Sequence, residues 1–449
     1  MYAHLRGRIG RVLQHWFVRR VAILQIGTVA ATLTQAVAGV LIARLLAPEA
    51  FGIYALAMGL AGMMSIVFGV GIQESVTSMV GRAYHSSDRA EVVSLFAYAL
   101  KASLMLGMCG IAIGALAPWI AHAWYGASAI GWYALVVVCA SVISTLFFAL
   151  ASVALQISGG VRSLSAFVFL DIFVRNGLAL GAILLGFGVA GAMAGHFVGA
   201  CVIALVSAWL LQRTHVRDSL MPSWEEILSH VARVSLARYM RASALVAFDR
   251  NIGTLFAVLP VVLLGTFVTA GEVGAFKVAF GFINIGVGMI GPLSTLLNGE
   301  FPRLELVGLA AVRRTFVRAT SVGVVITAAI AGVLALIAPT VFPILYGELF
   351  ADASHLVALL FGYGVVYGIG VALGPLWRAL HAVHYSIGIN IGVLALGIPT
   401  GLWAMGHFGV LGAIGMVTVW YGASHIVSWL MLWRIMSRRI AVATAPIIP

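Results

Sequence analysis

Long runs of uncharged, apolar residues are the feature that most constrains what this chain can fold into. A bilayer core takes about 20 apolar residues per helix, and runs of that length follow one another along the chain. Only 9% of the 449 residues are charged and 62% are hydrophobic, whereas a soluble domain is about a quarter charged. We therefore expect an all-α polytopic membrane protein of about twelve transmembrane helices, at roughly 21–46, 51–80, 91–120, 129–157, 164–186, 189–211, 232–267, 273–300, 316–343, 352–377, 385–405 and 409–433.

The arginines between these runs predict how the chain is inserted. No Lys or Arg occurs in the connections that follow odd-numbered runs, which are 47–50, 121–128, 187–188, 268–272, 344–351 and 406–408. The other connections and the two tails hold Arg6, Arg8, Arg11, Arg19, Arg20, Arg82, Arg89, Arg162, Arg213, Arg217, Arg233, Arg303, Arg313, Arg314, Arg318, Arg378, Arg434, Arg438 and Arg439. Basic loops stay in the cytoplasm, so we expect both termini in the cytoplasm.

The N-terminus allows two interpretations. Arginines followed by an apolar run, with Ala36-Val37-Ala38 as a cleavage site, would suit a signal peptide. The run continues to Leu46, however, which is too long for a signal core, and it has a counterpart in the second half of the chain. We therefore expect an uncleaved first helix.

A hairpin pattern around Pro48 occurs twice. Pro48 cannot continue a helix, so one span ends there and the next begins after a minimal turn. The pattern recurs 222 positions later, where Gly52, Ala57 and Gly59 match Gly274, Ala279 and Gly281. The dipeptides at 117–118 and 125–126 match those at 338–339 and 346–347. Because this offset contains six spans, the two halves have the same orientation, as in a parallel repeat.

The repeat predicts two six-helix lobes. Their limits are 21–211 for the N-terminal lobe and 232–433 for the C-terminal lobe. A basic cytoplasmic segment precedes them at 1–20, a cytoplasmic linker joins them at 212–231, and a cytoplasmic tail follows at 434–449. Within the linker, residues 224–228 are expected to form a short interfacial helix.

Charged residues inside the apolar runs are the candidate substrate contacts. An ionised side chain at membrane depth costs roughly 2.5–3.5 kcal/mol or more, so each needs a partner or a wet cavity. Lys101 lies about 15 Å into the third run, where it either faces a cavity or forms an internal ion pair. Asp171 and Arg175 can pair along one helix face. Either that pair is self-neutralising, or Arg175 and Asn176 contact substrate with Asp171 as counter-ion or proton carrier.

The seventh run carries a polar stripe. On a helical wheel Ser235, Arg238, Arg241 and Asp249 lie within about 120° of one another, so we expect them to face a cavity between the lobes, with Arg250 nearby. Arg238 and Arg241 lie near the cytoplasmic end, where a lipid pyrophosphate would enter. Arginines at this depth also simply anchor helices, and both interpretations stay open.

The remaining intramembrane charges lie near the ends of their runs. Lys277 is either a substrate contact or a structural group, and Arg44 can extend to the headgroups. Glu74 and Glu300 lie toward the cytoplasm, where solvation or pairing with loops is expected, with coupling as a further role for Glu74. Basic residues outnumber acidic ones, which suits an anionic substrate. Two lone histidines are expected to be packed or interfacial rather than proton carriers: His196 and His381.

The segment 44–57, RLLAPEAFGIYALA, resembles the signature after the first helix of bacterial polysaccharide exporters. These are O-antigen and exopolysaccharide flippases of the multidrug/oligosaccharidyl-lipid/polysaccharide superfamily, and Ala47 replaces their usual Gly. Such proteins often carry an acidic–basic pair before the second hairpin, whereas Asp249-Arg250 stands about three turns earlier here. The resemblance implies alternating-access translocation of a polyprenyl-pyrophosphate-linked oligosaccharide to the outer leaflet. It also implies membrane lipids, and a polymerase with chain-length machinery, as partners.

Other functions remain as alternatives. A cation-coupled multidrug exporter would favour surplus acid, a lipid II flippase usually has two further helices, and a membrane-embedded glycan polymerase needs a large outer loop. No nucleotide-binding or hydrolase motif occurs, so we expect a transporter rather than an enzyme, without a cofactor. The three cysteines show no metal-ligand spacing, and the dispersed arginines form no nucleic-acid patch.

Overall fold

The fold is built from helices, and no strand occurs in the described part of the chain. The computed structural model describes the backbone of residues 16–66 and 72–444, and the side chains in these ranges apart from 16–26, 72, 74, 241–250, 306 and 441–444. The elements in chain order are α2 (Trp16–Ser65), α3 (Ile72–His85), α4 (Arg89–Gly114), α5 (Ala117–Tyr125), α6 (Ser128–Ile157), α7 (Val161–Ala182), the π-turn η1 (Ile183–Phe187), α8 (Gly188–Arg217), α9 (Trp224–Val231), α10 (Leu236–Leu264), α11 (Ala270–Gly288), α12 (Gly291–Val307), α13 (Leu309–Tyr346), the 3₁₀ turn η2 (Glu348–Ala353), α14 (Ser354–Leu359), α15 (Phe361–Ile369), the 3₁₀ turn η3 (Gly370–Ala372), α16 (Leu373–Ala379), α17 (Val383–Phe408) and α18 (Val410–Thr444).

The predicted class, an all-α polytopic membrane protein, is confirmed. Among the described residues, eight helices are long and apolar enough to cross a membrane, or nine if a bent pair counts as one span. That number is lower than twelve because one continuous stretch, 161–217, contains both α7 and α8, and α2 contains two predicted spans. The predicted spans at 51–80, 91–120, 273–300 and 352–377 are each divided between two or more shorter helices.

The predicted hairpin at Pro48 is confirmed as a break inside α2. Ala47 has φ 61° and ψ 169°, so the helix stops there and a new one starts at Pro48. Proline suits the first position of a helix because its missing N–H would be unpaired there in any case. The conformation of Ala47 is one that residues other than glycine rarely adopt.

Contacts divide the chain into two units, and the predicted lobe limits remain a prediction. One unit comprises residues 1–45 and 60–250, and the other comprises residues 46–59 and 251–449. We refer to them below as the first and the second unit. The end of the predicted linker forms α9, as expected, and its first turn is a capping box in which Ser223 and Glu226 exchange side-chain and backbone hydrogen bonds.

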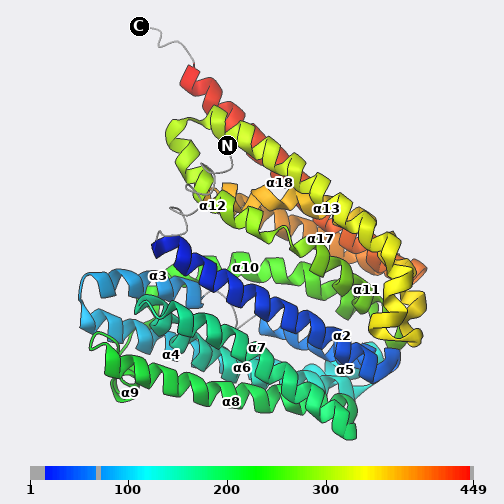
Figure 1. Ribbon diagram of the computed structural model, residues 1–449, viewed down its shortest axis with the longest axis horizontal. Coiled ribbons are helices and arrows are strands. Elements are labelled where there is room, and N and C mark those ends of the chain that lie inside the picture. Colours follow the sequence, from blue (N-terminus) through cyan, green and yellow to red (C-terminus); the bar gives the residue numbers. More distant parts are fainter. Residues whose placement is uncertain (1–15, 67–71, 445–449) are drawn as a thin grey trace, which may run out of the picture. The chain divides into compact units, whose positions relative to one another are not determined.

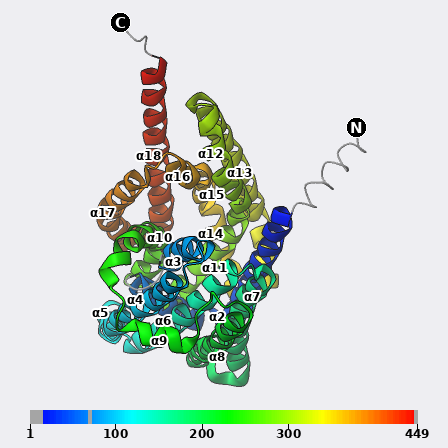
Figure 2. The ribbon, with the colours of Figure 1, turned by 90° about the vertical axis from the view of Figure 1, so that its left-hand side faces the viewer.

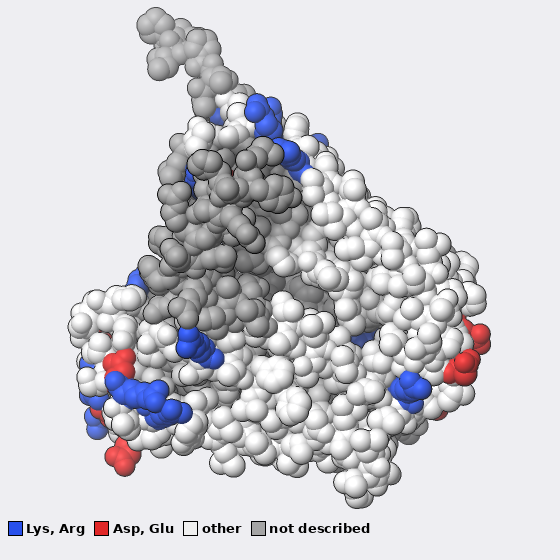
Figure 3. All heavy atoms as spheres, in the orientation of Figure 1, with Lys and Arg blue, Asp and Glu red and all other residues white. Residues whose placement is uncertain are grey.

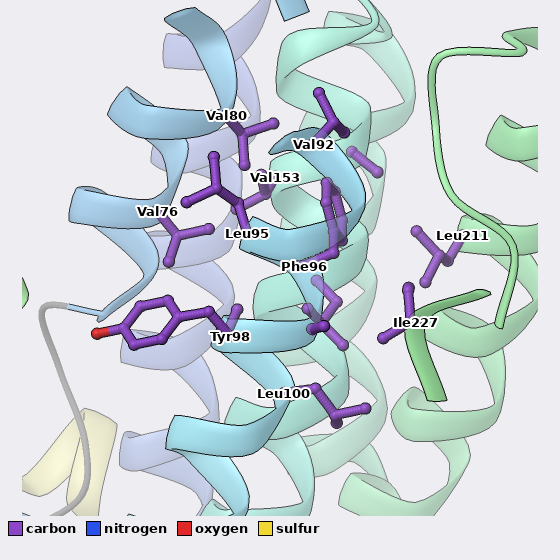
Figure 4. Packing of buried hydrophobic residues seen from close by; sticks show 14 of the residues in the cluster. Val76, Val80, Val92, Leu95, Phe96, Tyr98, Leu100, Val153, Leu211 and Ile227 are labelled. Atoms are coloured by element: carbon purple, nitrogen blue, oxygen red, sulfur yellow. The ribbon is translucent and has the colours of Figure 1, made fainter. Parts of the chain in front are cut away.

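In the first unit, Figure 1 shows α4, α6, α7 and α8 side by side. A buried cluster joins α3, α4 and α6 to the end of α8 and to α9 (Figure 4). Phe96 and Tyr98 of α4 are fully buried in it, and Ile227 of α9 packs there with Leu211 of α8. The amphipathic helix α9 is therefore anchored to the first unit by its apolar face.

In the second unit, α15 and α16 lie between α13 and α18 (Figure 2). The buried cluster at one end includes Phe301 of α12, Phe316 of α13 and Trp377 of α16. The residues 46–59 belong to this unit because Gly52 lies against the backbone of Ala270, where an added Cβ would be 1.7 Å from its carbonyl oxygen. Glu49 accepts a hydrogen bond from the backbone N–H of Gly271 at 3.0 Å.

The predicted repeat is visible in the local backbone of the two halves. Gly126 has φ 68° and Gly347, 221 positions later, has φ 90°. Each donates its N–H to the carbonyl four residues earlier at 3.0 Å. Gly188 (φ 54°) and Gly409 (φ 52°) are also 221 positions apart, and both have a positive φ. These turns need a left-handed residue, which glycine supplies without steric cost.

Candidate functional site

The predicted ion pair of α7 is present. A guanidinium nitrogen of Arg175 contacts a carboxylate oxygen of Asp171, one helical turn earlier. Asp171 is buried and Arg175 is half-buried. The other carboxylate oxygen of Asp171 is buried without a hydrogen-bond partner among the described residues. A buried carboxylate with one unpaired oxygen is costly, so this helix face carries more polarity than packing requires.

The helix α8 makes room for this pair with glycine. A Cβ added at Gly199 would lie 2.8 Å from the Cα of Arg175, and one at Gly195 would lie 2.6 Å from the Cα of Ala179. Small residues four apart allow two membrane helices to approach closely. His196, which is buried between these glycines, interacts electrostatically with Arg175. The three polar groups Asp171, Arg175 and His196 form what we call the α7–α8 cluster.

Asn176 points away from that cluster. It lines a cavity of about 390 Å³ that α2 and α7 enclose, and its amide donates to the carbonyl of Ile172 at 2.8 Å. The rest of this lining is nearly all apolar, and Leu33 and Phe173 are more than half exposed there. The structure therefore places Arg175 and Asn176 in two different environments, although they are neighbours in the sequence.

Lys101 contacts backbone rather than an acidic residue. Its amine donates to the carbonyl oxygen of Val234 at 2.9 Å and to that of Ala232 at 3.3 Å. These carbonyls belong to the connection between α9 and α10, so Lys101 fixes that connection against α4. Its predicted contact with substrate stays a prediction.

Arg238 belongs to a polar group with a residue that sequence reasoning missed, Glu91. A guanidinium nitrogen of Arg238 lies 3.2 Å from a carboxylate oxygen of Glu91, and the hydroxyl of Tyr239 donates to the same carboxylate at 2.9 Å. The guanidinium also lies 5.1 Å from the centre of the Tyr239 ring. Arg238 remains 65% exposed, so a ligand could replace part of its solvent shell.

The linker is tied to the start of α4 by a second ion pair. Arg89 lies 2.6 Å from a carboxylate oxygen of Glu226. The pKa of Glu226 is held below its usual value, first by the hydrogen bond from the backbone of Ser223 and then by Arg89. Figure 3 shows the charged side chains on this face in a few separate groups.

The other predicted site residues are dispersed. Lys277 is half-buried on α11, with no ion pair to a described residue, and Arg44 is exposed on α2. Glu300 lies 3.8 Å from Arg303, one turn further along α12, rather than beside a loop residue. Four predicted residues have side chains outside the described part of the chain: Glu74, Arg241, Asp249 and Arg250.

A second cavity, in the second unit, was not predicted. It has a volume of about 460 Å³ and is lined by Asn298, Glu305, Arg378 and His381 with two prolines and an alanine. From the sequence, Arg378 served only to predict the topology, and His381 was expected only to be packed or interfacial. The repeat contains a signal that could have identified them. The corresponding positions of the first half hold Gln156 and Gly159, so an arginine and a histidine are not required there by the fold. Elsewhere, the described residues include no group of three His, Cys, Asp or Glu that could hold a metal ion.

Apolar helices of membrane-spanning length, with charges paired inside them and arginines at their ends, define a polytopic membrane protein. The solved structures that resemble it agree in fold. A multidrug resistance MATE family transporter of the MOP superfamily, in an inward-facing conformation, matches with a TM-score of 0.72 at 17% identity over 92% of this chain and 96% of that one. The lipid II flippase MurJ, inward closed, matches with a TM-score of 0.67 at 11% identity over 93% and 87%. A eukaryotic MATE transporter, AtDTX14, matches with a TM-score of 0.62 at 14% identity over 94% and 98%.

Sequence comparison identifies the family. No curated protein sequence matches the chain. Residues 17–297 match the sequence profile of the family described as polysaccharide biosynthesis protein. This chain belongs to that family, as the resemblance in segment 44–57 implied, and its fold is similar to that of a MATE family transporter of the MOP superfamily.

Proposed function

We propose that this protein moves a polyprenyl-pyrophosphate-linked oligosaccharide from the cytoplasmic to the outer leaflet by alternating access, for cell-surface polysaccharide biosynthesis. The observation that carries the proposal is membership of the polysaccharide biosynthesis protein family, by a match that covers more than half of the chain. The proposal includes a bacterial inner membrane with both termini in the cytoplasm. Its partners are membrane lipids, and the polymerase and chain-length machinery that would use the product.

The charges within the helices support an anionic substrate. Arginine binds phosphate oxygens through a planar fork of N–H donors. In the proposal, Arg238 and Arg241 meet the pyrophosphate at the cytoplasmic end, and Arg250 and Lys277 add positive charge along its path. Lys101, Arg175 and Asn176 contact the headgroup or glycan. Asp171, Asp249 and Glu74 serve as counter-ions or carry a coupling proton.

The α7–α8 cluster is the part of this proposal with the clearest geometry. Asp171 and Arg175 form an ion pair beside the buried His196, and one oxygen of Asp171 is unpaired among the described residues. A buried pair of this kind is seldom the most stable way to fill a helix contact. We assign it to function for that reason.

The test is translocation by the purified protein in proteoliposomes. A polyprenyl-pyrophosphate oligosaccharide is placed in one leaflet, and its exposure on the far leaflet is followed with a membrane-impermeant glycan-binding reagent. We expect far-leaflet exposure to rise only when the protein is present. Exchange of drugs or cations without glycolipid movement would instead indicate a multidrug exporter, and movement of lipid II alone would indicate a lipid II flippase.

A further inference from the structure

The unpredicted cavity of the second unit lies beside α12 and α16. Its polar lining consists of Asn298 and Glu305 from α12, Arg378 from α16, and His381 from the turn after α16. All four are exposed. The arginine pattern predicts that this turn, at 380–382, faces the cytoplasm. The cavity would therefore be reached from the side on which lipid-linked sugars are made.

The guanidinium of Arg378 is held in place by a neutral partner. Its Nη2 and Nε atoms donate to the side-chain oxygen of Asn298 at 2.7 and 3.2 Å. Gly374 lies one turn earlier on α16, and a Cβ added there would be 3.5 Å from Nη2. This contact orients the guanidinium. A fixed, charged guanidinium is suited to a phosphate group.

His381 occupies a position where the first half of the chain has glycine. It has φ 53°, and Gly159, 222 positions earlier, has φ 77°. Both end a helix in the same way, because Ala382 donates its N–H to the carbonyl of Trp377 at 2.9 Å and Gly160 donates to that of Leu155 at 2.8 Å. This is the Schellman arrangement, in which glycine is the favoured left-handed residue.

A histidine at this position is therefore unfavourable for the backbone. Left-handed conformations are strained for residues with a Cβ, although histidine tolerates them better than most. The exposed side chain of His381 buries little surface that could offset the strain. Strain of this kind is concentrated where a side chain has a functional role.

The guanidinium and the imidazole of this lining occur only in the second half. The residues at the corresponding positions of the first half are Gln156 for Arg378, Gly159 for His381 and Thr77 for Asn298. Since the first half forms the same helix end without these groups, the fold does not need them.

We propose that this cavity binds the glycosyl-phosphate headgroup of the lipid-linked substrate before translocation, an inference that rests on the proposed function. Arg378 and His381 contact the phosphate oxygens. Asn298 donates to a sugar hydroxyl through its amide nitrogen, and Glu305 accepts from a sugar hydroxyl through its carboxylate. The site thus binds both parts of the headgroup, the phosphate and the first sugar.

The experiment measures binding to the full chain in phosphatidylcholine nanodiscs. The main probe is undecaprenyl-pyrophosphoryl N-acetylglucosamine, compared with undecaprenol and with inorganic pyrophosphate. The variants Arg378→Gln and His381→Gly carry the residues of the first half. The control is Arg318→Gln, which removes an exposed arginine of α13 that does not line the cavity.

We expect Arg378→Gln to weaken binding of the main probe about tenfold, as loss of a charge-assisted hydrogen bond would, and His381→Gly to weaken it severalfold. The melting temperature of His381→Gly should equal or exceed that of the wild type, because its backbone strain is relieved. Arg318→Gln should bind normally.

Normal binding by both cavity variants would overturn this inference and leave the proposed function standing. Binding of inorganic pyrophosphate as tightly as the main probe, with the same losses in the variants, would assign the cavity to free phosphates and overturn the headgroup assignment. A wild-type protein that neither binds nor moves the main probe would overturn the proposed function itself.

Discussion

The two halves of the chain pack their last helix pair in the same way, with the large and small residues exchanged. In the first half Arg175 of α7 lies against Gly199 of α8, where an added Cβ would be 2.8 Å from the Cα of Arg175. The position corresponding to Arg175 is Gly397 of α17. There Trp420 of α18, which corresponds to Gly199, lies so close that a Cβ added at Gly397 would be 2.2 Å from its indole nitrogen.

A second contact in each pair shows the same exchange. Gly195 of α8 lies against Ala179 of α7, whereas in the second half Gly401 of α17 accommodates Met416 of α18. The close approach of the helices is thus conserved between the halves, while the helix that supplies the glycine changes. Close packing in membrane helices requires a small residue on one side only.

The two helix pairs also differ in charge at these positions. The α7–α8 cluster of Asp171, Arg175 and His196 corresponds to Val393, Gly397 and Val417 in the second half, with no charged group. At these positions the second half has valine and glycine. The fold of this helix pair therefore does not need the cluster, and we expect its charges to have a role beyond packing.

The largest effect is expected when the cluster is broken on one side. Arg175→Leu leaves Asp171 buried without its cation, which should lower the free energy of unfolding by about 3–5 kcal/mol. The double variant Asp171→Val/Arg175→Leu removes both charges and should regain most of that stability. Thermal unfolding in detergent compares the three proteins. A double variant as unstable as the single one would contradict the claim that this helix pair packs without the two charges.

A smaller effect is expected from filling the close contact of the first half. Gly195→Leu places a Cβ 2.6 Å from the backbone of Ala179, so α7 and α8 must move apart, at about 1–3 kcal/mol. The matched control is Gly181→Leu on α7, because an added Cβ there has no atom within 4 Å. Thermal unfolding in detergent should separate the two variants, and equal stability would show that the contact is looser than the structure indicates.

Relief of backbone strain should raise stability slightly. Ala47 adopts φ 61° at the hairpin, whereas Thr269, at the corresponding position of the second half, has φ −66° and caps α11 with its side chain. Ala47→Gly should therefore increase the free energy of unfolding by about 1 kcal/mol, and Thr269→Gly, which removes a cap, should decrease it by about 1 kcal/mol. The free energies of unfolding are measured by thermal unfolding. If both variants gain stability or both lose it, the two hairpins do not differ in this way.

The smallest effect concerns the linker. The pKa of Glu226 is lowered by the backbone of Ser223 and by Arg89, so its ionised form favours the folded state. This contribution, below about 1 kcal/mol, is present above the ordinary carboxyl pKa and is lost as the pH falls through the lowered one. The stability difference between wild type and Glu226→Gln should shrink as the pH is lowered from 6 to 3. A difference that stays constant would show that Glu226 does not titrate in this way.

The sequence was sufficient for the architecture because its signals are local. Apolar length predicts spans, Pro48 predicts the hairpin, and Asp171 and Arg175 at i, i+4 predict their pair. All three predictions were confirmed. The capping residues Ser223 and Glu226 also belong to a short segment, and the helix α9 was expected there.

Contacts between distant segments could not be predicted in the same way. Lys101 was expected at membrane depth, but its partners are carbonyls more than 130 positions away along the chain. Arg175 and Asn176 were treated together, although they face different helices. The cavity at Arg378 and His381 forms only where α12 meets α16, so neither segment alone contains the signal.

The most direct test of the central claim is glycolipid translocation by the double variant Asp171→Val/Arg175→Leu in proteoliposomes, beside the wild type. The account predicts a folded protein that has lost transport, because the charges of the α7–α8 cluster serve the substrate or its coupling and not the packing. Transport at the wild-type rate by that folded variant would contradict the account.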